Sequence, residues 1–431
     1  MISQFVFGLL LIIALCLFYK NSKAIVRNIL LGKKINRTDN VSLRLKTMLL
    51  VAFGQKKMFK RPIVALLHLV VYVGFCIINI EMVEIVIDGL FGTHRILSSL
   101  DGFYDFLIFT FEVLAFLVIV GCLVFLVRRN LLKIARLNKK ELDNWPKTDA
   151  NLILIAEILL MTAFLFMNAA DYKLQLLGVQ NYHIAGAFPI SKYLVSILPN
   201  SAENLMLIER FCWWFHIIGV LAFLNYLTIS KHLHIILAFP NTFFTNLSKQ
   251  GQFKNLAAVT QEVKVMFDPS LPPHATDESM KFGVKDVQDL TWKNLLDSYT
   301  CTECGRCTAV CPANITGKLL SPRKIMMDTR DRISEVGKNI DKNGSFIDDE
   351  KSLLDYYITR EEIWACTTCN ACVEECPVNI NPLEIIIGLR QYSIMEESKA
   401  PATINSMFTN LENNGAPWKY SQSDRANWKN T

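Results

Sequence analysis

The chain has 431 residues, which is enough for two or three domains. Hydrophobic residues make up 52% of it and charged residues only 19%, a balance skewed toward membrane proteins. The long apolar runs all precede Phe239, and the remainder has the composition of an ordinary soluble domain. The net charge of +6 can therefore indicate a partner only once it is known which segments carry the basic residues.

Five segments are apolar over the roughly 20 residues that a helix needs to cross a bilayer. They are approximately Ile2–Tyr19, Pro62–Gly89, Phe103–Val127, Asn151–Asp171 and Phe211–Ser230. The first lacks a basic leading segment and a small-residue cleavage site, so we interpret it as a permanent span and not as a signal peptide. The sequence thus predicts a five-helix transmembrane bundle.

Positive charge is concentrated in two of the four loops between these spans. Lys20–Arg61 holds twelve Lys or Arg residues, and Arg128–Lys147 holds seven. The loop segments near Asp88–Asp101 and Tyr172–Glu209 hold only Arg95, Lys173 and Lys192. The positive-inside rule then predicts an N-terminus outside the bacterial inner membrane and a cytoplasmic location for everything after the fifth helix. It also disfavours the alternative that the basic loops bind nucleic acid.

Histidines in the apolar half indicate a b-type haem, which takes one imidazole from each of two facing helices. His216 and His234 are 18 residues apart on the fifth helix and its extension, which is five full turns of a continuous helix, or about 27 Å. His68 lies near the basic end of the second helix, at the depth of His234. We predict that His68 and His234 bind one haem and that His216 binds a second one nearer the outer face. His232 is predicted to point away from both residues of the fifth helix.

Residues 1–240 resemble the membrane cytochrome b subunit of respiratory nitrate reductases and the related subunits of sulfite-reducing complexes. The resemblance rests on the five helices, the outer N-terminus and the five-turn spacing of His216 and His234. It implies two haems and a histidine pair on the second helix, ten residues apart.

The sequence departs from that pattern at Ile78, which occupies the second place after His68. His216 therefore lacks its implied partner. His94 and His183, both in outer loops, are the candidates to replace it, and a single haem is the alternative to two.

Acidic residues also occur inside the second span. A charged side chain there costs free energy of insertion, so we expect these residues to have a function. Glu81, Glu84 and Asp88 recur at i, i+3 and i+7 on one helix face. Proton exchange with a quinone would use such groups. Hydrogen bonds between helices are the alternative.

The part of the chain after the fifth span is predicted to be helical, without alternating strand patterns. A connector, Phe239–Val287, contains a proline-rich kink at Asp268–Pro273 that a helix cannot cross. The apolar pattern predicts a short helix over Leu290–Tyr299, and Ser321 and Pro322 open another that continues to about Ser334. Further helices are predicted over Asp348–Tyr357 and Pro382–Glu397. The predicted domains are 1–238 (membrane), 239–287 (connector), 288–400 (ferredoxin-like) and 401–431 (partner-docking tail).

Eight of the twelve cysteines form two runs of identical spacing, C-x2-C-x2-C-x3-C-P, on the reducing side of the membrane. This is the bacterial [4Fe–4S] ligand pattern, in which the fourth cysteine of each run binds the other cluster. We predict one cluster at Cys301, Cys304, Cys307 and Cys376, and a second at Cys366, Cys369, Cys372 and Cys311. A zinc site is the alternative, since paired C-x2-C elements also bind zinc. Zinc needs only four ligands, however, and rarely follows the full doubled pattern.

The runs TCTECGRCTAVCPANITGKLLSPRKI (Thr300–Ile325) and ACTTCNACVEECPVNINPLEII (Ala365–Ile386) are separated by mostly helical sequence, too long for a compact ferredoxin. They resemble the α-helical ferredoxin domain of heterodisulfide reductase subunits and succinate dehydrogenase iron–sulfur proteins, over about Asp289–Trp428. In that family the segment matching Asn410–Trp428 leads toward a catalytic domain with CCG repeats. No CCG occurs in this sequence, so we expect such a module to be another polypeptide.

The sequence contains no phosphate-binding glycine loop, no nucleophile triad and no flavin fingerprint. We therefore expect a membrane-anchored electron-transfer subunit that links the membrane quinone to a cytoplasmic partner through haem b and two [4Fe–4S] clusters. The candidate partners are a CCG-domain iron–sulfur protein, an electron-transfer flavoprotein and a flavin dehydrogenase. The alternative is a membrane scaffold or redox sensor without quinone turnover.

Overall fold

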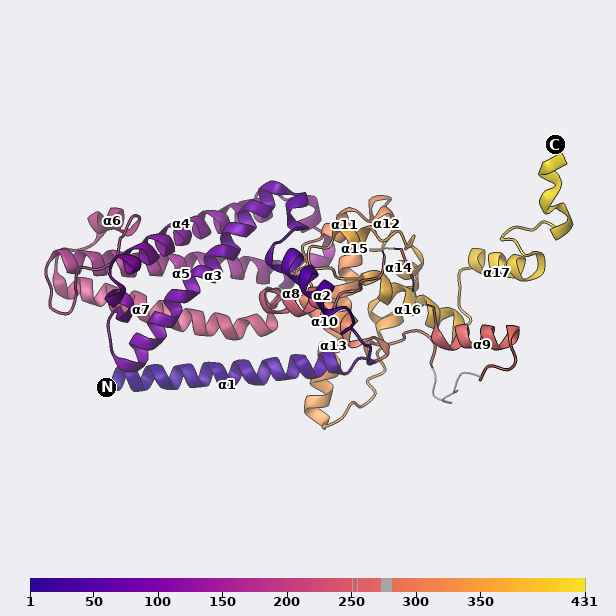
Figure 1. The fold of residues 1–431 in the computed structure, drawn as a ribbon, viewed down its shortest axis with the longest axis horizontal. Coiled ribbons are helices and arrows are strands. Elements are labelled where there is room, and N and C mark those ends of the chain that lie inside the picture. Colours follow the sequence, from indigo (N-terminus) through magenta and orange to yellow (C-terminus); the bar gives the residue numbers. More distant parts are fainter. Residues whose placement is uncertain (250, 254, 273–280, 431) are drawn as a thin grey trace.

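The computed structural model describes residues 1–249, 251–253, 255–272 and 281–430, and Figure 1 shows that they form an elongated, helical molecule. Five helices are long and apolar enough to cross a membrane. They are α1 (Ile2–Leu30), α3 (Pro62–Phe91), α4 (Gly102–Asn130), α5 (Trp145–Leu176) and α7 (Ala202–Tyr226). These helices confirm the five predicted spans.

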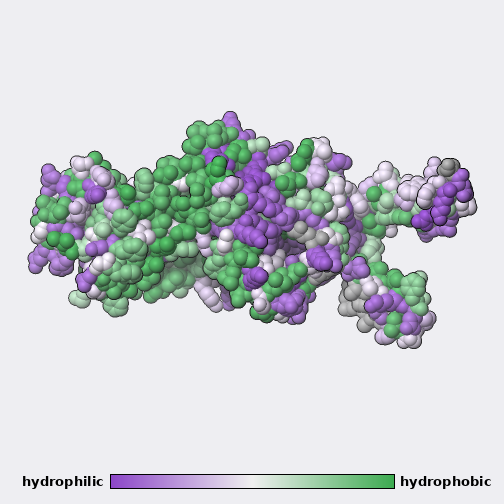
Figure 2. Space-filling view, turned by 45° about the horizontal axis from the view of Figure 1, so that its top comes forward, coloured by the Kyte–Doolittle hydropathy of each residue, from purple (hydrophilic) through white to green (hydrophobic). Residues whose placement is uncertain are grey.

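The helices of the bundle pack in the order α3, α4, α5 and α7, and α1 lies against α3 and α7. Phe7, Ile108, Phe111, Phe164 and Ile217 fill the interior. The outward side chains are also apolar, as on α1, and Figure 2 shows a continuous hydrophobic surface over the bundle. A polar band follows where the bundle meets the C-terminal part of the chain. An apolar surface of this extent is what a lipid environment requires.

The C-terminal domain is built from short helices around the two cysteine runs. They are α10 (Trp292–Thr300), α11 (Arg306–Ala309), α12 (Pro312–Ile315), α13 (Pro322–Asn343), α14 (Arg360–Trp364), α15 (Ala371–Glu375) and α16 (Pro382–Met395). Their core includes Leu295, Ile325, Ile333, Leu353 and Ile385. Within the described residues no strand forms and two isolated bridges are present, so the predicted all-α class is confirmed.

Smaller elements connect and extend these two parts. They are α2 (Val41–Met48), α6 (Ser191–Leu194), α8 (His234–Phe243), α9 (Ala257–Phe267) and α17 (Ala402–Asn414). Helix α9 ends directly before Asp268, where the proline-rich kink was predicted; the last residue of that kink, Pro273, lies outside the described residues. Helices α9 and α17 project from the end of the molecule that is far from the bundle (Figure 1).

Helix α13 begins as predicted, with the Ser321 hydroxyl accepting a hydrogen bond from the Lys324 amide at 3.4 Å and Pro322 in the first turn. It continues to Asn343, beyond the predicted end at Ser334, and packs against α1. A Cβ atom on Gly337 would lie 2.4 Å from the Asn28 side-chain oxygen, so a larger residue would require that side chain to move. Helix α13 therefore anchors the C-terminal domain to the first span.

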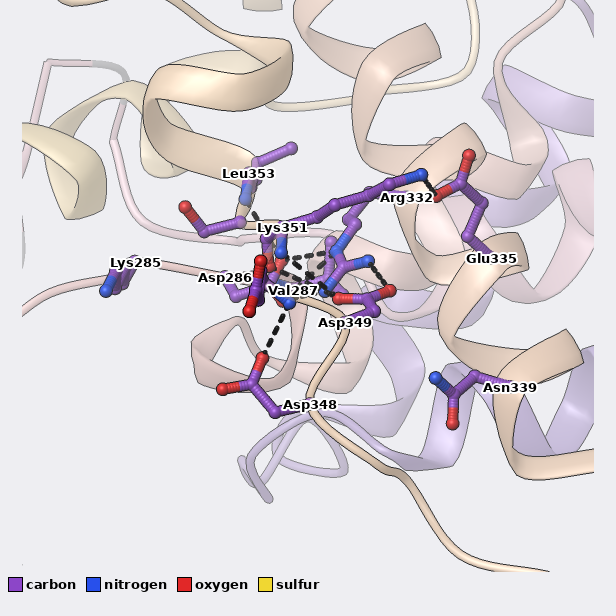
Figure 3. A network of polar contacts seen from close by, with 12 residues as sticks. Lys285, Asp286, Val287, Arg332, Glu335, Asn339, Asp348, Asp349, Lys351 and Leu353 are labelled. Atoms are coloured by element: carbon purple, nitrogen blue, oxygen red, sulfur yellow. Dashed lines mark hydrogen bonds and ion pairs between the residues drawn. The ribbon is translucent and has the colours of Figure 1, made fainter. Parts of the chain in front are cut away.

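The predicted helix over Asp348–Tyr357 is wrong, because a tertiary ion network holds this segment open (Figure 3). The buried Arg332 guanidinium binds Asp349 at 2.6 Å and Asp286 at 2.7 Å, and it donates to the Lys351 carbonyl at 2.8 Å. Only a single helical turn forms near the end of the segment, and Asp355 there has a φ of +72°.

Both basic loops lie at the end of the bundle that carries the cysteine runs. Lys60, just before α3, binds Glu374 at 2.6 Å, and Glu141, just before α5, binds Arg323 at 2.7 Å. Since the loops after α3 and α5 lie at the other end, the bundle has one end facing the cysteine runs and one facing away from them.

Candidate functional site

The first cysteine run and the last cysteine of the second run meet in one place. Helix α10 ends at Thr300 and delivers Cys301, and α11 begins after Gly305, whose φ of +70° turns the loop sharply. Cys301, Cys304, Cys307 and Cys376 line one small cavity there, and Cys372 lines it as well. Cys307 interacts electrostatically with the other four.

The remaining thiols form a second group. Cys311 interacts electrostatically with Cys366 and with Cys372, and both of these also interact with Cys369. Cys311 and Cys372 are buried and Cys369 is exposed, so one side of this group reaches the protein surface. The division of the eight thiols into the two predicted ligand sets, with the fourth cysteine exchanged between runs, stays a prediction, because Cys372 interacts with thiols of both groups.

The chemistry of the thiols suits an iron–sulfur core. Burial raises the pKa of Cys301 and of Cys372 to about 12, and burial together with the nearby Cys304 raises that of Cys376 to about 11. Several thiolates at such a place need a cationic partner, and iron supplies that charge. Backbone N–H groups of Thr368 and Ile380 donate to the sulfurs of Cys366 and Cys376 at 3.4 and 3.3 Å, as in the surroundings that tune clusters.

No three His, Cys, Asp or Glu side chains of the described residues are arranged to hold a single metal ion. A cubane cluster does not need such an arrangement, because each of its thiolates binds a different iron.

The three histidines predicted to bind haem share one hydrogen-bond pattern. In each, Nδ1 faces a carbonyl oxygen: His68 faces Gln55 Oε1 at 3.2 Å, His216 faces Leu160 O at 3.0 Å, and His234 faces Lys231 O at 3.1 Å. An oxygen acceptor places the ring proton on Nδ1 and leaves the Nε2 lone pair available, which is the usual state of a metal-binding histidine. Sequence spacing contains no signal for this feature.

The expected five-turn relation between His216 and His234 is wrong, because the helix is interrupted between them. Helix α7 ends at Tyr226, Ser230 is extended, and α8 begins at His234. Asp149 of α5 fixes the break by accepting hydrogen bonds from the Ser230 hydroxyl at 2.7 Å and the Lys231 amide at 3.1 Å.

The break also overturns the predicted orientation of His232. Its ring centroid lies 5.4 Å from that of His234, and both rings interact electrostatically with His68. Burial lowers the pKa of His234 and lowers that of His232 to about 3, so both are neutral at ordinary pH. His68, His232 and His234 therefore form one group of imidazoles at the end of the bundle that faces the cysteine runs.

His94 lies at the opposite end of the bundle. Its Nε2 is 3.2 Å from Asp171 Oδ2, and its ring packs against Tyr182. His216 instead packs against Phe164, with a ring separation of 6.2 Å. The Nε2 atom of His94, which would have to bind a haem iron, is thus taken up by a carboxylate. His183 is exposed.

A polar cavity occupies this far end, between α1, α3, α5 and α7. Its wall contains the acidic residues predicted on the second span, two indole rings and several further charges: Glu81, Glu84, Asp88, Asp171, Glu209, Arg95, Arg210, Trp213 and Trp214. Glu81 is 3% exposed, and its Oε2 has no hydrogen-bond partner within the described residues. Arg95 binds Asp171 at 2.7 Å and Asn168 at 2.8 Å. Sequence reasoning found the carboxylates of α3 but missed Arg95, Asp171 and the tryptophans.

The histidine group and the first cysteine loop are joined by buried ion pairs. Lys231 binds Glu303, which lies between Cys301 and Cys304, and Arg330 binds the same carboxylate at 2.8 Å. Arg136 donates to the carbonyl oxygen of Cys304. The first thiol group is thereby fixed against the end of the membrane bundle.

Known proteins resemble both parts of the chain. Residues 300–380 match the family described as a 4Fe-4S dicluster domain. The chain is 29% identical to the probable iron-sulfur-binding oxidoreductase FadF of Bacillus subtilis, over 96% of this chain and 59% of that protein. It is 27% identical to the EtfAB:quinone oxidoreductase of Syntrophomonas wolfei, over 92% and 55%.

A third relative is the probable membrane-anchored ferredoxin of Chromohalobacter salexigens, 32% identical over 35% of this chain and 25% of that protein. The chain thus spans less than two thirds of these relatives' own lengths. No solved structure gives a significant match. The chain thus carries a 4Fe-4S dicluster domain and five helices that could cross a membrane, and it is similar to iron–sulfur oxidoreductases and to a membrane-anchored ferredoxin.

Proposed function

We propose that the protein passes electrons between the membrane quinone pool and a cytoplasmic redox partner, through haem b and two [4Fe–4S] clusters. One observation carries this proposal: the first thiol group lies at the end of the bundle where His68, His232 and His234 gather, and the Lys231–Glu303 ion pair joins the two sites. Electron carriers held at these two sites would be neighbours.

The chain's residues fit these cofactors. Cys301, Cys304, Cys307 and Cys376 would hold one cluster, and Cys366, Cys369, Cys372 and Cys311 the second. His68 and His234 would bind a haem through Nε2, with the carbonyl groups on Nδ1 fixing the ring orientation. When bound, these groups supply one-electron carriers.

Two further histidines have defined places in this proposal. His232 lies beside His234 and can take its place as the second ligand. His216 would bind a second haem. His94 can act as its partner only after its Nε2 leaves Asp171.

The cavity at the far end of the bundle fits quinone exchange. Reduction and oxidation of a quinone move protons as well as electrons, and Glu81 offers a carboxylate oxygen that no described residue occupies. Trp213 and Trp214 supply aromatic surface for a quinone ring. The printed name of the Syntrophomonas wolfei relative, EtfAB:quinone oxidoreductase, supports a quinone and an electron-transfer flavoprotein as the two partners. A CCG-domain iron–sulfur protein and a flavin dehydrogenase are the other candidate partners.

The location and the domain boundaries complete the proposal. Basic loops at the cysteine end of the bundle support a bacterial inner-membrane protein with its N-terminus outside and its cluster domain in the cytoplasm. Residues 1–238 would bind haem, as in the membrane cytochrome b subunits that they resemble, and 239–287 connect them to the cluster domain, 288–400. The tail, 401–431, exposes Trp418 and Tyr420 and would dock the partner.

The test is a reduced-minus-oxidised visible spectrum of the anaerobically purified protein, with iron analysis and EPR. We expect about eight cluster irons per chain, a haem α-band, and reduction of the haem by a quinol. His68→Ala should remove the haem at the cysteine end and keep both cluster signals, and His183→Ala, at an exposed loop, is the matched control. Clusters without haem and without response to quinol would instead support the scaffold or sensor function. Zinc in place of iron would refute the clusters.

A further inference from the structure

Arg306 lies between the two sites that the proposed function connects. It stands immediately before Cys307 and is 2% exposed. Its side chain lines the same cavity as Cys301, Cys304, Cys307 and Cys376. The guanidinium is also close enough to His68 to act on it electrostatically. One positive charge therefore adjoins both the first thiol group and the histidine group.

The hydrogen bonds of Arg306 are incomplete. Nη1 donates to the Lys57 carbonyl at 3.2 Å, but Nη2 is buried and has no partner among the residues that the structure describes. A buried guanidinium N–H without an acceptor is costly, and the strongest acceptors for it are anionic. The open donor thus indicates an anionic group at this place.

The surroundings of Arg306 carry several further positive charges. Arg136 interacts electrostatically with Arg306, Arg61 and Arg128, and of these Arg61 is paired with Glu375 at 3.3 Å. The thiolate of Cys304, which lines the cavity, acts on Arg136 with the opposite sign to these arginines. An anionic occupant of the cavity would balance this cluster of arginines.

We infer that Arg306 is a positioning and charge-compensating residue shared by the two cofactor sites, whose Nη2 donates to the anionic cluster in the cavity and whose charge acts on the haem at His68. The inference rests on the proposed function. A cation next to a redox centre favours its reduced form, because that form carries one more negative charge. Arg306 therefore raises the reduction potentials of both the first cluster and the haem.

The test is a redox titration of the purified full chain carrying Arg306→Met, Arg306→Gln or Arg306→Lys, followed by EPR for the clusters and by visible absorbance for the haem. We expect the Met and Gln variants to lower the midpoint potentials of the first cluster and of the haem, and to leave the second cluster unchanged. The Lys variant should stay near the wild-type potentials, because it keeps the charge. Lys60→Met removes a neighbouring cation that already binds Glu374, and should shift neither potential.

Cofactor content is measured before the titration. If the Met and Gln variants lose the first cluster while the Lys variant keeps it, that loss also supports the inference. Full cofactor content with unchanged potentials, or a shift of only one centre, would overturn it. A wild-type protein without haem or without clusters would refute the proposed function itself.

Discussion

Lys231, at the break between α7 and α8, forms a buried ion pair with Glu303 of the first cysteine loop. The Lys231 ammonium also donates to the Pro146 carbonyl at 2.6 Å, so the contact joins α5, the histidine group and the thiol group. Burial opposes ionisation of Glu303, but Arg330 and Lys231 outweigh it and hold the pKa of this carboxyl below its usual value. The pair fixes the distance between the two proposed cofactor sites.

Lys231→Met should lower the free energy of unfolding by about 3 kcal/mol, because it leaves a buried carboxylate short of one partner. It should also slow electron transfer between haem and cluster. Thermal unfolding of the detergent-solubilised protein measures the first effect and flash-induced kinetics the second. Lys231→Arg is the control and should retain both properties; equal stability and rate in the Met variant would contradict the role of the pair.

Asp149→Asn should reduce haem content. Asp149 is 2% exposed and holds the helix break through Ser230 and Lys231, and the Asn side chain offers one carbonyl oxygen where the carboxylate offers two. The change should cost about 1–3 kcal/mol and displace His232 and His234. Pyridine haemochrome assays quantify the haem. Asp143→Asn, at an exposed site just before α5, is the control, and equal haem content in both variants would show that Asp149 does not maintain the site.

The free energy of unfolding of the protein should fall as the pH is lowered from 7 to 5, because buried His232 stays neutral in the folded state. Burial lowers the pKa of His232 to about 3, whereas the unfolded chain titrates near 6.5. The unfolded state therefore binds more protons in this window, and acid favours unfolding. His232→Phe, which keeps a ring against Phe223, should flatten the dependence of the unfolding midpoint on pH. An identical pH slope in the variant would show that His232 does not contribute.

Arg332→Met should destabilise the cluster domain by about 3 kcal/mol, since Asp286 and Asp349 would lose a buried cation. Hydrogen exchange should rise most in residues 348–353, which the network holds open. The matched variant is Lys351→Met, whose ion pair with Glu335 is exposed and contributes at most about 1 kcal/mol. Equal destabilisation by the two variants would contradict the larger contribution of Arg332 to the stability of the cluster domain.

Features encoded by local spacing could be predicted from the sequence. The five spans depend on continuous apolar runs, and the start of α13 depends on the adjacent Ser321 and Pro322. Both are properties of neighbouring residues.

Features fixed by distant residues could not be predicted. The break after α7 depends on Asp149, 81 residues before Ser230, and the open segment after Asp348 depends on Arg332 and Asp286. The acceptors that orient His68 and His216 come from Gln55 and Leu160, which no periodicity relates to them. The far cavity likewise requires the packing of four helices.

The most direct test of the proposed electron path is the reoxidation of pre-reduced protein by a short-chain quinone, followed anaerobically by stopped-flow absorbance. If electrons pass from the clusters through the His68 site to the far cavity, the wild-type clusters are reoxidised rapidly. The clusters of His68→Ala should then stay reduced on the same timescale, although a small soluble oxidant still reaches them through the exposed side at Cys369. Equally fast reoxidation by quinone in both proteins would contradict the path.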